Sequence, residues 1–363
     1  MTGPVIIMAG GTGGHILPGL AVARLLRAKG IPVLWLGTAT GMEARLVAEA
    51  GFAMASIDIG GLRGKDWKTR LAAPWRLFTA IRQALAVMHE QSPRLVLGFG
   101  GFVAGPGGLA ARMRGVPLVI HEQNAVAGLT NRVLARLANK VLAGYAGAFD
   151  GAYEVIGNPV RPDIAVLPPP ELRMAGRRGP LRLLVVGGSL GAQALNETVP
   201  RALALLAGDE RPEVWHQAGG KMIDTARAIY AQEGVEPGEK IRVEPFIDDM
   251  ASAYAWADLV LCRSGALTVA ELAAAGIGSI LVPFPHAVDD HQTRNAAVLA
   301  ETGAAELIQQ TELTAGLLAE RLRVLGADRA RVLDMARRAR AQARPDAAAR
   351  VLEQCAPWLE ETA

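Results

Sequence analysis

Short apolar runs alternate along the whole chain with longer segments in which apolar residues recur at helical spacing. Continuous apolar runs of this length are typical of strands buried on both faces, and strands that alternate with helices form parallel sheets. The pattern therefore predicts an α/β protein. We expect strands at residues 5–9, 33–36, 95–97, 118–120, 140–143, 181–186, 213–216, 241–244, 259–262 and 280–282.

Two of these strands run directly into glycine-rich turns. Residues 10–15 (GGTGGH) follow the first strand, and residues 187–191 (GGSLG) follow the strand at 181–186. Glycine turns of this kind let backbone N–H groups and a helix N-terminus approach an anion without interfering side chains. One such turn near the start of each half predicts two similar domains that close on a phosphorylated ligand.

The length and the proline distribution support two domains. A chain of 363 residues is long for one domain and suits two of about 150 to 200 residues. Prolines interrupt the strand and helix alternation over residues 157–180, which we interpret as the linker. We expect one domain over residues 1–162, a second over 163–344, and a last helix over 346–359.

The cysteine content and the apolar segments indicate the compartment in which the protein is found. The two cysteines, Cys262 and Cys355, cannot form a disulfide framework, which favours a reducing cytoplasm. The first apolar run ends at glycines and has no basic segment before it, so we interpret it as a strand and predict no signal peptide. No apolar stretch reaches the roughly 18 residues that a membrane span needs.

Charge is distributed unevenly. Residues 1–164 contain 17 Lys/Arg against 9 Asp/Glu, and residues 60–115 contain 9 against 2. A basic region of this kind attracts the phosphates of nucleic acid or of an anionic lipid surface, although it could also be a solubilising face.

An amphipathic helix is predicted inside this basic region, starting at Pro74. Leu77, Ile81, Ala84 and Met88 form one apolar stripe that can face a core. Trp75 and Phe78 lie on a second stripe, bordered by the basic residues Arg63, Lys65, Lys68, Arg70, Arg76 and Arg82. This second stripe is typical of an interfacial membrane anchor, whereas the alternative is that both aromatic side chains are also buried in the core.

A strand-to-helix junction at residues 262–276 has the features of a nucleotide site. The strand ends at Cys262, Ser264 and Gly265 form a turn, and a helix runs from Ala266 to Gly276. The first backbone N–H groups of that helix lack intrahelical acceptors and can bind a phosphate. Glu271 follows along the helix, where it could accept hydrogen bonds from both ribose hydroxyls or could be an ordinary exposed glutamate.

Three further polar features are candidates for chemistry. His15 closes the first glycine turn, where a helix N-terminus favours its neutral form, so it is a candidate base or a cap. Residues 121–124 (HEQN) follow an apolar strand, where polar groups usually serve a site. Residues 286–295 contain acidic, amide and histidine side chains without metal-ligand spacing, so we interpret them as a sugar-binding loop.

A nicotinamide enzyme is disfavoured by two features. Residues 105–110 match a G-x-G-x-x-A pattern, but they contain Pro106 and do not directly follow a strand. The second strand also lacks the acidic residue that would bind the ribose of NAD.

Taken together, seven motifs resemble the MurG family of peptidoglycan N-acetylglucosaminyltransferases. They occur in order from near residue 4 to about residue 300, and we find them at residues 8–15 (MAGGTGGH), 98–108 (GFGGFVAGPGG), 121–124 (HEQN), 157–161 (GNPVR), 187–189 (GGS), 246–250 (FIDDM) and 263–271 (RSGALTVAE). The resemblance implies a GT-B fold, in which two Rossmann-like parallel-sheet domains face an interdomain cleft. It also implies that the C-terminal segment, residues 345–363, docks back on the N-terminal domain.

The resemblance also implies a substrate and a site. The enzyme would transfer GlcNAc from UDP-GlcNAc to the C4 hydroxyl of MurNAc-pentapeptide-pyrophosphoryl-undecaprenol, converting lipid I to lipid II with inversion. Such an enzyme is metal-independent, needs no cofactor, and sits peripherally on the cytoplasmic face of the cell membrane. The implied roles are diphosphate binding for Arg161, Ser189 and the helix start at Ala266, Leu267, Thr268, Val269 and Ala270; ribose binding for Glu271; uracil binding through the backbone of Ile247; GlcNAc binding for Asn124 and Gln292; and acceptor binding for His15 with Thr12, Gly13 and Gly14.

The base and two family positions stay open at this point. His15 is the candidate catalytic base, with Glu122 as the alternative. Phe102 stands where the family often has Tyr, and Leu190 where it usually has Gln, so contacts assigned to those positions are in doubt. Other functions on the same fold would be a UDP-GlcNAc 2-epimerase or a non-catalytic nucleotide-sugar-binding subunit of a membrane complex.

Overall fold

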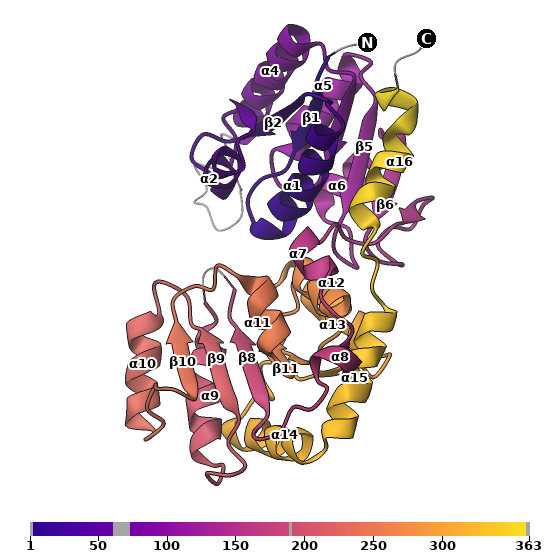
Figure 1. Ribbon diagram of the computed structural model, residues 1–363. Helices are drawn as coiled ribbons and strands as arrows, with labels where there is room; N and C mark the ends of the chain where they lie inside the picture. Colours follow the sequence, from indigo (N-terminus) through magenta and orange to yellow (C-terminus); the bar gives the residue numbers. More distant parts are fainter. Residues whose placement is uncertain (1–2, 61–72, 189–190, 361–363) are drawn as a thin grey trace. The chain divides into compact units, whose positions relative to one another are not determined.

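The computed structural model describes residues 3–60, 73–188 and 191–360. It divides into two compact units, which we call unit 1 (Met1–Arg161 with Arg344–Ala363) and unit 2 (Pro162–Ala343). Figure 1 shows that each unit is built around its own sheet with helices on both faces.

Unit 1 contains a seven-stranded parallel sheet with the order β3-β2-β1-β4-β5-β6-β7. The order reverses between β1 and β4, so the chain after these two strands leaves the sheet at a topological switch point. The strands are β1 (Val5–Met8), β2 (Val33–Gly37), β3 (Ala53–Ser56), β4 (Leu95–Gly98), β5 (Leu118–Glu122), β6 (Lys140–Ala143) and β7 (Glu154–Val155).

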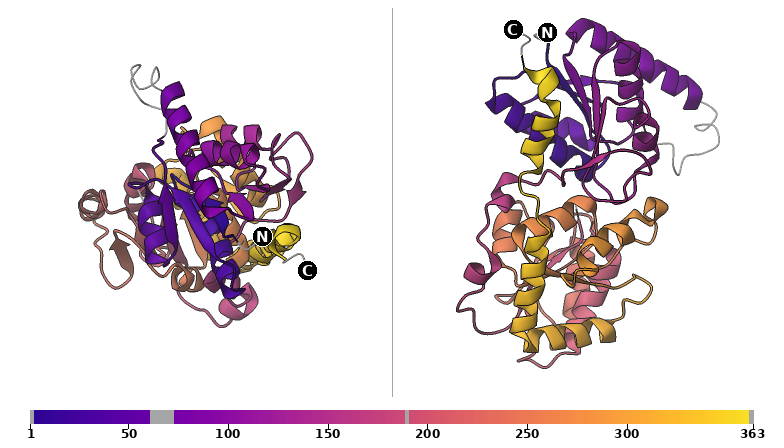
Figure 2. Two further views of the ribbon diagram at one scale, coloured as in Figure 1. Left: turned by 90° about the horizontal axis from the view of Figure 1, so that it is seen from above. Right: turned by 90° about the vertical axis from the view of Figure 1, so that its right-hand side faces the viewer.

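Alternating strand residues supply two separate cores in unit 1. Val5 and Ile7 face one core, and Ile6 and Met8 face the other. The first core is covered by α1 (Gly13–Ala28), α2 (Met42–Glu49) and α16 (Ala347–Leu359), and the second by α4 (Ala73–Gln91), α5 (Ala104–Met113) and α6 (Leu129–Leu134). The C-terminal helix α16 therefore completes the core of the N-terminal unit, beside α1 (Figures 1 and 2).

Unit 2 contains a six-stranded parallel sheet with the order β10-β9-β8-β11-β12-β13, and its switch point lies between β8 and β11. The strands are β8 (Arg182–Val186), β9 (Glu213–Gln217), β10 (Ile241–Glu244), β11 (Leu259–Cys262), β12 (Gly278–Leu281) and β13 (Ala305–Leu307). The helices are α7 (Pro162–Ala165), α8 (Pro170–Arg173), α9 (Gln193–Ala204), α10 (Ile223–Gln232), α11 (Met250–Trp256), α12 (Ala266–Ala275), α13 (His291–Ala300), α14 (Ala315–Ala327) and α15 (Arg329–Ala341), with a short 3-10 helix, η1 (Val288–Asp290).

The predicted fold class, two Rossmann-like domains with parallel sheets, is confirmed. The sequence pattern missed β3, β7 and β13, which are edge strands of two to four residues, each with at most one β-branched residue. It also placed the penultimate strand of unit 2 at residues 280–282, whereas β12 spans Gly278–Leu281 and begins with two residues of low strand propensity.

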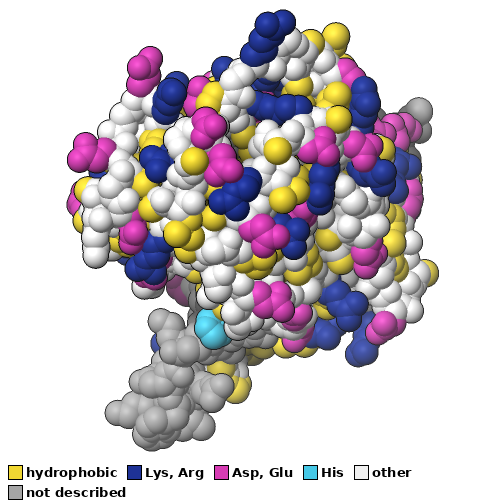
Figure 3. Space-filling model, turned by 90° about the horizontal axis from the view of Figure 1, so that it is seen from below, with side chains coloured by type: hydrophobic (Ala, Val, Ile, Leu, Met, Phe, Trp, Pro, Cys, Tyr) yellow, Lys and Arg dark blue, Asp and Glu magenta, His cyan; other side chains and the backbone are white. Residues whose placement is uncertain are grey.

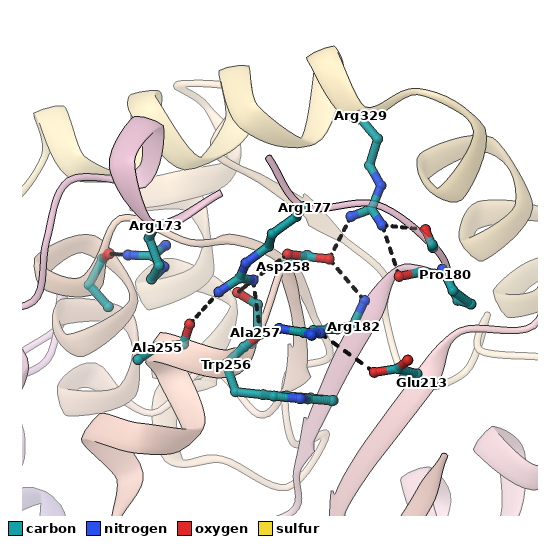
Figure 4. A network of polar contacts seen from close by, with 12 residues as sticks. Arg173, Arg177, Pro180, Arg182, Glu213, Ala255, Trp256, Ala257, Asp258 and Arg329 are labelled. Atoms are coloured by element: carbon teal, nitrogen blue, oxygen red, sulfur yellow. Dashed lines mark hydrogen bonds and ion pairs between the residues drawn. The ribbon is translucent and has the colours of Figure 1, made fainter. Parts of the chain in front are cut away.

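The proline-rich segment expected to be a linker is ordered on unit 2 from Pro162 onward. Arg173 donates hydrogen bonds to the carbonyls of Ala275 and Gly276 at the C-terminal end of α12. Arg177 donates to the last carbonyls of α11 and also pairs with the buried Asp258 (Figure 4). Prolines end regular elements without making a segment mobile, and here arginine side chains hold the segment on the unit.

Basic and acidic side chains are mixed on one face of the molecule. Figure 3 shows basic and acidic side chains interspersed over that face, without a large area of one sign. Over the part of the chain that the structure describes, no helix is both long and apolar enough to cross a membrane.

Burial of His216 predicts that stability falls in mild acid. His216 lies on β9, its Nδ1 lies 3.0 Å from the Tyr230 hydroxyl, and burial lowers its pKa from 6.5 to about 3. The unfolded chain therefore binds a proton below pH 6.5 that the folded chain excludes until about pH 3, so stability is lost as pH falls through that window.

We expect His216 alone to lower the free energy of unfolding by about 2 kcal/mol between pH 7 and pH 5. Urea titrations at both pH values, followed by a probe in unit 2, measure this loss. His216→Phe should have a smaller difference between the two pH values than the wild type. An unchanged difference would show that His216 does not carry this acid sensitivity.

Candidate functional site

The carboxyl ends of β1, β4 and β5 meet at one edge of the unit 1 sheet, and polar residues gather there. The glycine turn at residues 10–14 follows β1, a second turn at residues 99–103 follows β4, and residues 121–124 end β5. Parallel α/β sheets bind their ligands at this edge, beside the switch point. The structure therefore brings together Thr12, Gly13, Gly14, His15, Glu122 and Asn124, as the sequence motifs suggested.

Two glycine turns pack directly on each other at this edge. Gly101 has φ +80°, and a Cβ built on it would lie 2.2 Å from the carbonyl oxygen of Gly10. Only glycine fits at this position, since a side chain would collide with backbone. Backbone packing between the two turns therefore fixes the turn that leads into α1, without a contribution from a ligand.

Glu43 supports the candidate site and was missed by the sequence analysis. It is fully buried on α2, and its carboxylate accepts hydrogen bonds from the backbone N–H of Gly11 and from the N–H and hydroxyl of Thr38. Buried carboxylates normally need such partners. Glu43 therefore holds the backbone of the glycine turn in place. No periodicity or motif in the sequence distinguishes it from an ordinary helix glutamate.

His15 is the third residue of α1 and is half-buried. Its Nδ1 lies 2.8 Å from Oε1 of Gln123, and its ring passes close to Gly100. His15 therefore places an imidazole ring at the start of α1, with Nδ1 bound to Gln123.

Glu122 has a different environment, because donors surround its carboxylate. Oε1 accepts from the backbone N–H and the side-chain amide of Asn124, each at 2.9 Å. Oε2 accepts from the backbone N–H of Gly128 at 3.2 Å and from Nδ2 of Asn131 at 2.9 Å. The side chain is 1% exposed, so this carboxylate orders the loop and presents Asn124.

In unit 2 the start of α12 lies directly after β11, next to the switch point. Gly265 is the N-cap and has no side chain to cap the helix, and the first intrahelical bond runs from Val269 N–H to Gly265 O. The N–H groups of residues 266–268 therefore point out of the helix end, as anion sites require. The Ser264 hydroxyl is buried here, and among the described residues it has no hydrogen-bond partner.

Glu271 is 4% exposed, so the alternative that it is an exposed helix glutamate is wrong. The hydroxyl of Tyr254 on α11 donates a hydrogen bond to Oε2 of Glu271, with the two oxygens 3.3 Å apart. Ile247 is buried in the loop that leads from β10 into α11. The hydrogen bond between Tyr254 and Glu271 thus connects α11, the helix that follows the Ile247 loop, to α12.

The segment 286–295, predicted to be a sugar-binding loop, runs from the loop after β12 into the first turns of α13, whose second residue is Gln292. Its Oε1 accepts from the backbone N–H of Phe284 at 2.8 Å, which fixes the orientation of the side-chain amide. Asp289 and Asp290 precede it with φ values of 52° and 50°, a conformation that non-glycine residues rarely adopt. Strained backbone of this kind is concentrated at functional sites.

Arg161 and Ser189 were both predicted to bind the diphosphate. Arg161 is the last residue of the first segment of unit 1 and is half-buried. Ser189 and Leu190 lie outside the described residues, as do Arg63, Lys65, Lys68 and Arg70 of the basic border. Over the described chain, no three His, Cys, Asp or Glu side chains are grouped as metal ligands would be.

The first turns of α4 expose their apolar side chains. Trp75 is 72% exposed and Phe78 is 52% exposed, so the alternative that both are buried in the core is wrong. Leu77, expected on the core-facing stripe, is also exposed, whereas Ala80, Ala84 and Met88 are buried. The helix contacts the core only from its second turn onward, which is why the stripe prediction failed at Leu77.

Comparison with known proteins gives matches over nearly the whole chain. The family model for the glycosyltransferase family 28 N-terminal domain matches residues 5–143, and the model for its C-terminal domain matches residues 182–351. A Ralstonia nicotianae protein named UDP-N-acetylglucosamine–N-acetylmuramyl-(pentapeptide) pyrophosphoryl-undecaprenol N-acetylglucosamine transferase is 56% identical over 97% of this chain and 95% of its own length. A Burkholderia pseudomallei protein of the same name is 56% identical with the same coverage.

Solved structures agree with this result. The crystal structure of Acinetobacter baumannii MurG is 42% identical, has a TM-score of 0.84, and is covered over 99% of its length by 98% of this chain. The calicheamicin glycosyltransferase CalG4, at 19% identity and a TM-score of 0.66, shares the fold.

Proposed function

This chain belongs to glycosyltransferase family 28, and on that premise we propose that it transfers GlcNAc from UDP-GlcNAc to lipid I, producing lipid II for peptidoglycan synthesis. The observation that carries the proposal is 56% identity, over 97% of the chain, to transferases named for this reaction. The geometry supports it because unit 2 offers an anion site with a buried carboxylate, and unit 1 offers a base beside a glycine turn.

In the proposed donor half, unit 2 binds UDP-GlcNAc. The N–H groups at the start of α12, together with Arg161 and Ser189, would hold the diphosphate. Glu271 would accept hydrogen bonds from the ribose, the Ile247 backbone would contact the uracil, and Gln292 with Asn124 would contact the sugar. Because Oε1 of Gln292 is occupied by the Phe284 N–H, its amide N–H₂ is the group oriented to donate to a sugar hydroxyl.

In the proposed acceptor half, His15 is the general base. It would remove the proton of the muramoyl C4 hydroxyl as that oxygen attacks the anomeric carbon, while UDP leaves from the opposite side. Negative charge that develops on the leaving diphosphate would be stabilised by the N-terminus of α12 and by Arg161. Glu122 is the weaker candidate, since four donors already hold its carboxylate and proton uptake would break that arrangement.

Mass spectrometry after incubation with UDP-GlcNAc and a short-chain lipid I analogue tests the proposal. A product heavier by one N-acetylhexosamine, together with released UDP, is expected. Release of UDP and a free 2-epimerised sugar without acceptor would instead identify an epimerase. Tight UDP-GlcNAc binding with no turnover would identify a binding subunit.

We further propose that the exposed face at the start of α4 binds the cytoplasmic surface of the membrane. Trp75 and Phe78 form a ring pair 5.8 Å apart, and Arg76 and Arg82 lie on the same helix. Exposed aromatic rings with flanking arginines suit an anionic lipid surface.

Replacing Trp75 and Phe78 together by glutamate should lower binding to anionic phospholipid vesicles by about tenfold or more, because apolar contact is lost and charge repulsion is added. Co-sedimentation with vesicles measures the change. Leu205→Glu, at an exposed leucine of unit 2, is the matched control and should bind as the wild type does. Full vesicle binding by the double variant would exclude this face as the anchor.

A further inference from the structure

Three hydrogen bonds in series connect the backbone of unit 1 to the ring of His15. The carbonyl oxygen of Gly157 lies 2.9 Å from Nε2 of His121. Nδ1 of His121 lies 3.1 Å from Nε2 of Gln123. Oε1 of Gln123 lies 2.8 Å from Nδ1 of His15. All four residues belong to unit 1, and both His121 and Gln123 are buried.

The first bond fixes the protonation of His121. A carbonyl oxygen only accepts, so Nε2 of His121 must carry the hydrogen that it donates to Gly157. Burial lowers the pKa of His121 to about 4, so the ring is neutral near pH 7 and its Nδ1 has no hydrogen. Nδ1 of His121 is therefore an acceptor.

The acceptor on His121 fixes the orientation of the Gln123 amide. Only the N–H₂ end of Gln123 can donate to Nδ1 of His121, and the same group also donates to the His121 carbonyl at 3.0 Å. Two acceptors on one side leave the amide oxygen on the other side, facing His15. A flipped amide would place its oxygen against two acceptors and is disfavoured.

The orientation of Gln123 in turn fixes the proton of His15. The amide oxygen only accepts, so Nδ1 of His15 must be the donor, and a neutral imidazole then has a bare Nε2. We propose that Gln123 is a positioning residue that holds His15 in the tautomer with the hydrogen on Nδ1, so that Nε2 accepts the proton of the attacking hydroxyl. This inference rests on the proposed function, in which His15 is the base.

An amide beside a catalytic histidine acts differently from a carboxylate in the same position. A carboxylate beside a catalytic histidine fixes its tautomer and also stabilises the imidazolium, because it is charged. The Gln123 amide carries no net charge, so it selects the nitrogen that accepts the proton without adding an ion pair. Its anchor, His121, is connected to the backbone and does not depend on any ligand.

Nitrogen NMR of the substrate-free protein tests the inference directly. With ¹⁵N-histidine labelling near pH 7.5, the long-range spectrum reports which nitrogen of each of the six histidines carries hydrogen. His15 is identified by the signal lost in His15→Ala. We expect Nδ1–H for His15 and Nε2–H for His121, and in Gln123→Met we expect His15 to move toward Nε2–H. Wild-type His15 with hydrogen on Nε2, or an unchanged His15 signal in Gln123→Met, would overturn the proposal.

Kinetics distinguish positioning from a loss of structure. Gln123→Met should lower kcat by about 10²-fold with the KM for UDP-GlcNAc within about threefold of wild type. The double variant His15→Ala, Gln123→Met should be no slower than His15→Ala alone, since Gln123 acts through His15. Independent, multiplying losses would mean that Gln123 acts only through the fold, which would contradict the proposal.

A matched control is Asn139, which directly precedes β6. Asn139 accepts from the backbone N–H of Leu118 at the opposite end of β5, so Asn139→Ala removes a structural amide away from the site. It should leave the His15 signal and kcat unchanged, and a changed His15 signal would overturn the specific role of Gln123. If the wild-type protein shows the Nδ1–H signal but transfers no sugar, the proposed function fails and the assignment of the proton stands.

Discussion

Replacement of His15 by alanine is expected to lower kcat for sugar transfer by about 10² to 10⁴-fold while leaving UDP binding unchanged. The reason is geometric: His15 is the half-buried imidazole at the start of α1, with Nδ1 bound to Gln123 and Nε2 left for the acceptor hydroxyl. The nucleotide contacts are assigned to residues of unit 2 and to Arg161, so donor affinity should not depend on His15. Steady-state turnover with saturating acceptor, together with calorimetric titration of UDP, measures both quantities.

Glu122→Gln serves as the comparison, because it removes the charge of the other candidate base with little change in shape. We expect it to lower stability, since an amide N–H₂ must face groups that donate to the present carboxylate. Its remaining activity should exceed that of His15→Ala. Normal turnover in His15→Ala, with strong loss in Glu122→Gln at a temperature where both are folded, would transfer the role of base to Glu122.

Replacement of Asp258 by alanine is expected to lower the free energy of unfolding of unit 2 by about 3 to 5 kcal/mol. Asp258 is 1% exposed and binds Arg177 and Arg329, each at 2.5 Å, and it also accepts from the Arg182 N–H at 3.1 Å (Figure 4). Its removal leaves two guanidinium groups and a backbone N–H without this acceptor. The same change removes the carboxylate partner of Arg177, which also holds the segment after α8 on the end of α11.

Urea denaturation followed by a probe in unit 2 measures this effect. Asp334→Ala is the control, since Asp334 of unit 2 forms an exposed pair with Arg338 one helical turn away, and such pairs contribute about 0.3 to 0.5 kcal/mol. Asp258 precedes β11, whereas the proposed donor site lies at the other end of that strand. The variant should therefore keep its kcat where it is folded, and a loss below about 1 kcal/mol would contradict a central stabilising role for this network.

Much of the fold could be predicted from the sequence because buried parallel strands are continuous apolar runs. The runs at 140–143, 241–244 and 259–262 coincide with β6, β10 and β11. The α12 helix also ends where Gly276 predicts, with that glycine at φ +62°. Strands such as β7, with two half-buried residues, depend on pairing with a neighbour, and no local pattern predicts them.

The residues of the candidate site could be proposed from the sequence, but the contacts among them could not. Glycine turns and the HEQN segment mark strand ends, and the topology then brings β1, β4 and β5 to one edge. The contact between His15 and Gln123 joins residues 108 positions apart, and the one between Gly11 and Glu43 depends on how α2 packs. Such pairings depend on tertiary structure, so the sequence showed the residue types and not which atoms meet.

The anomeric configuration of the newly formed bond tests the account most directly. A single displacement, with His15 activating the acceptor hydroxyl on the face opposite the leaving UDP, inverts the α-linked donor. Proton NMR of the disaccharide made from UDP-GlcNAc and a short-chain lipid I analogue should therefore show a β-linked GlcNAc on the muramoyl C4 oxygen. An α-linked product, or the absence of an acceptor-dependent product, would contradict direct displacement by this chain.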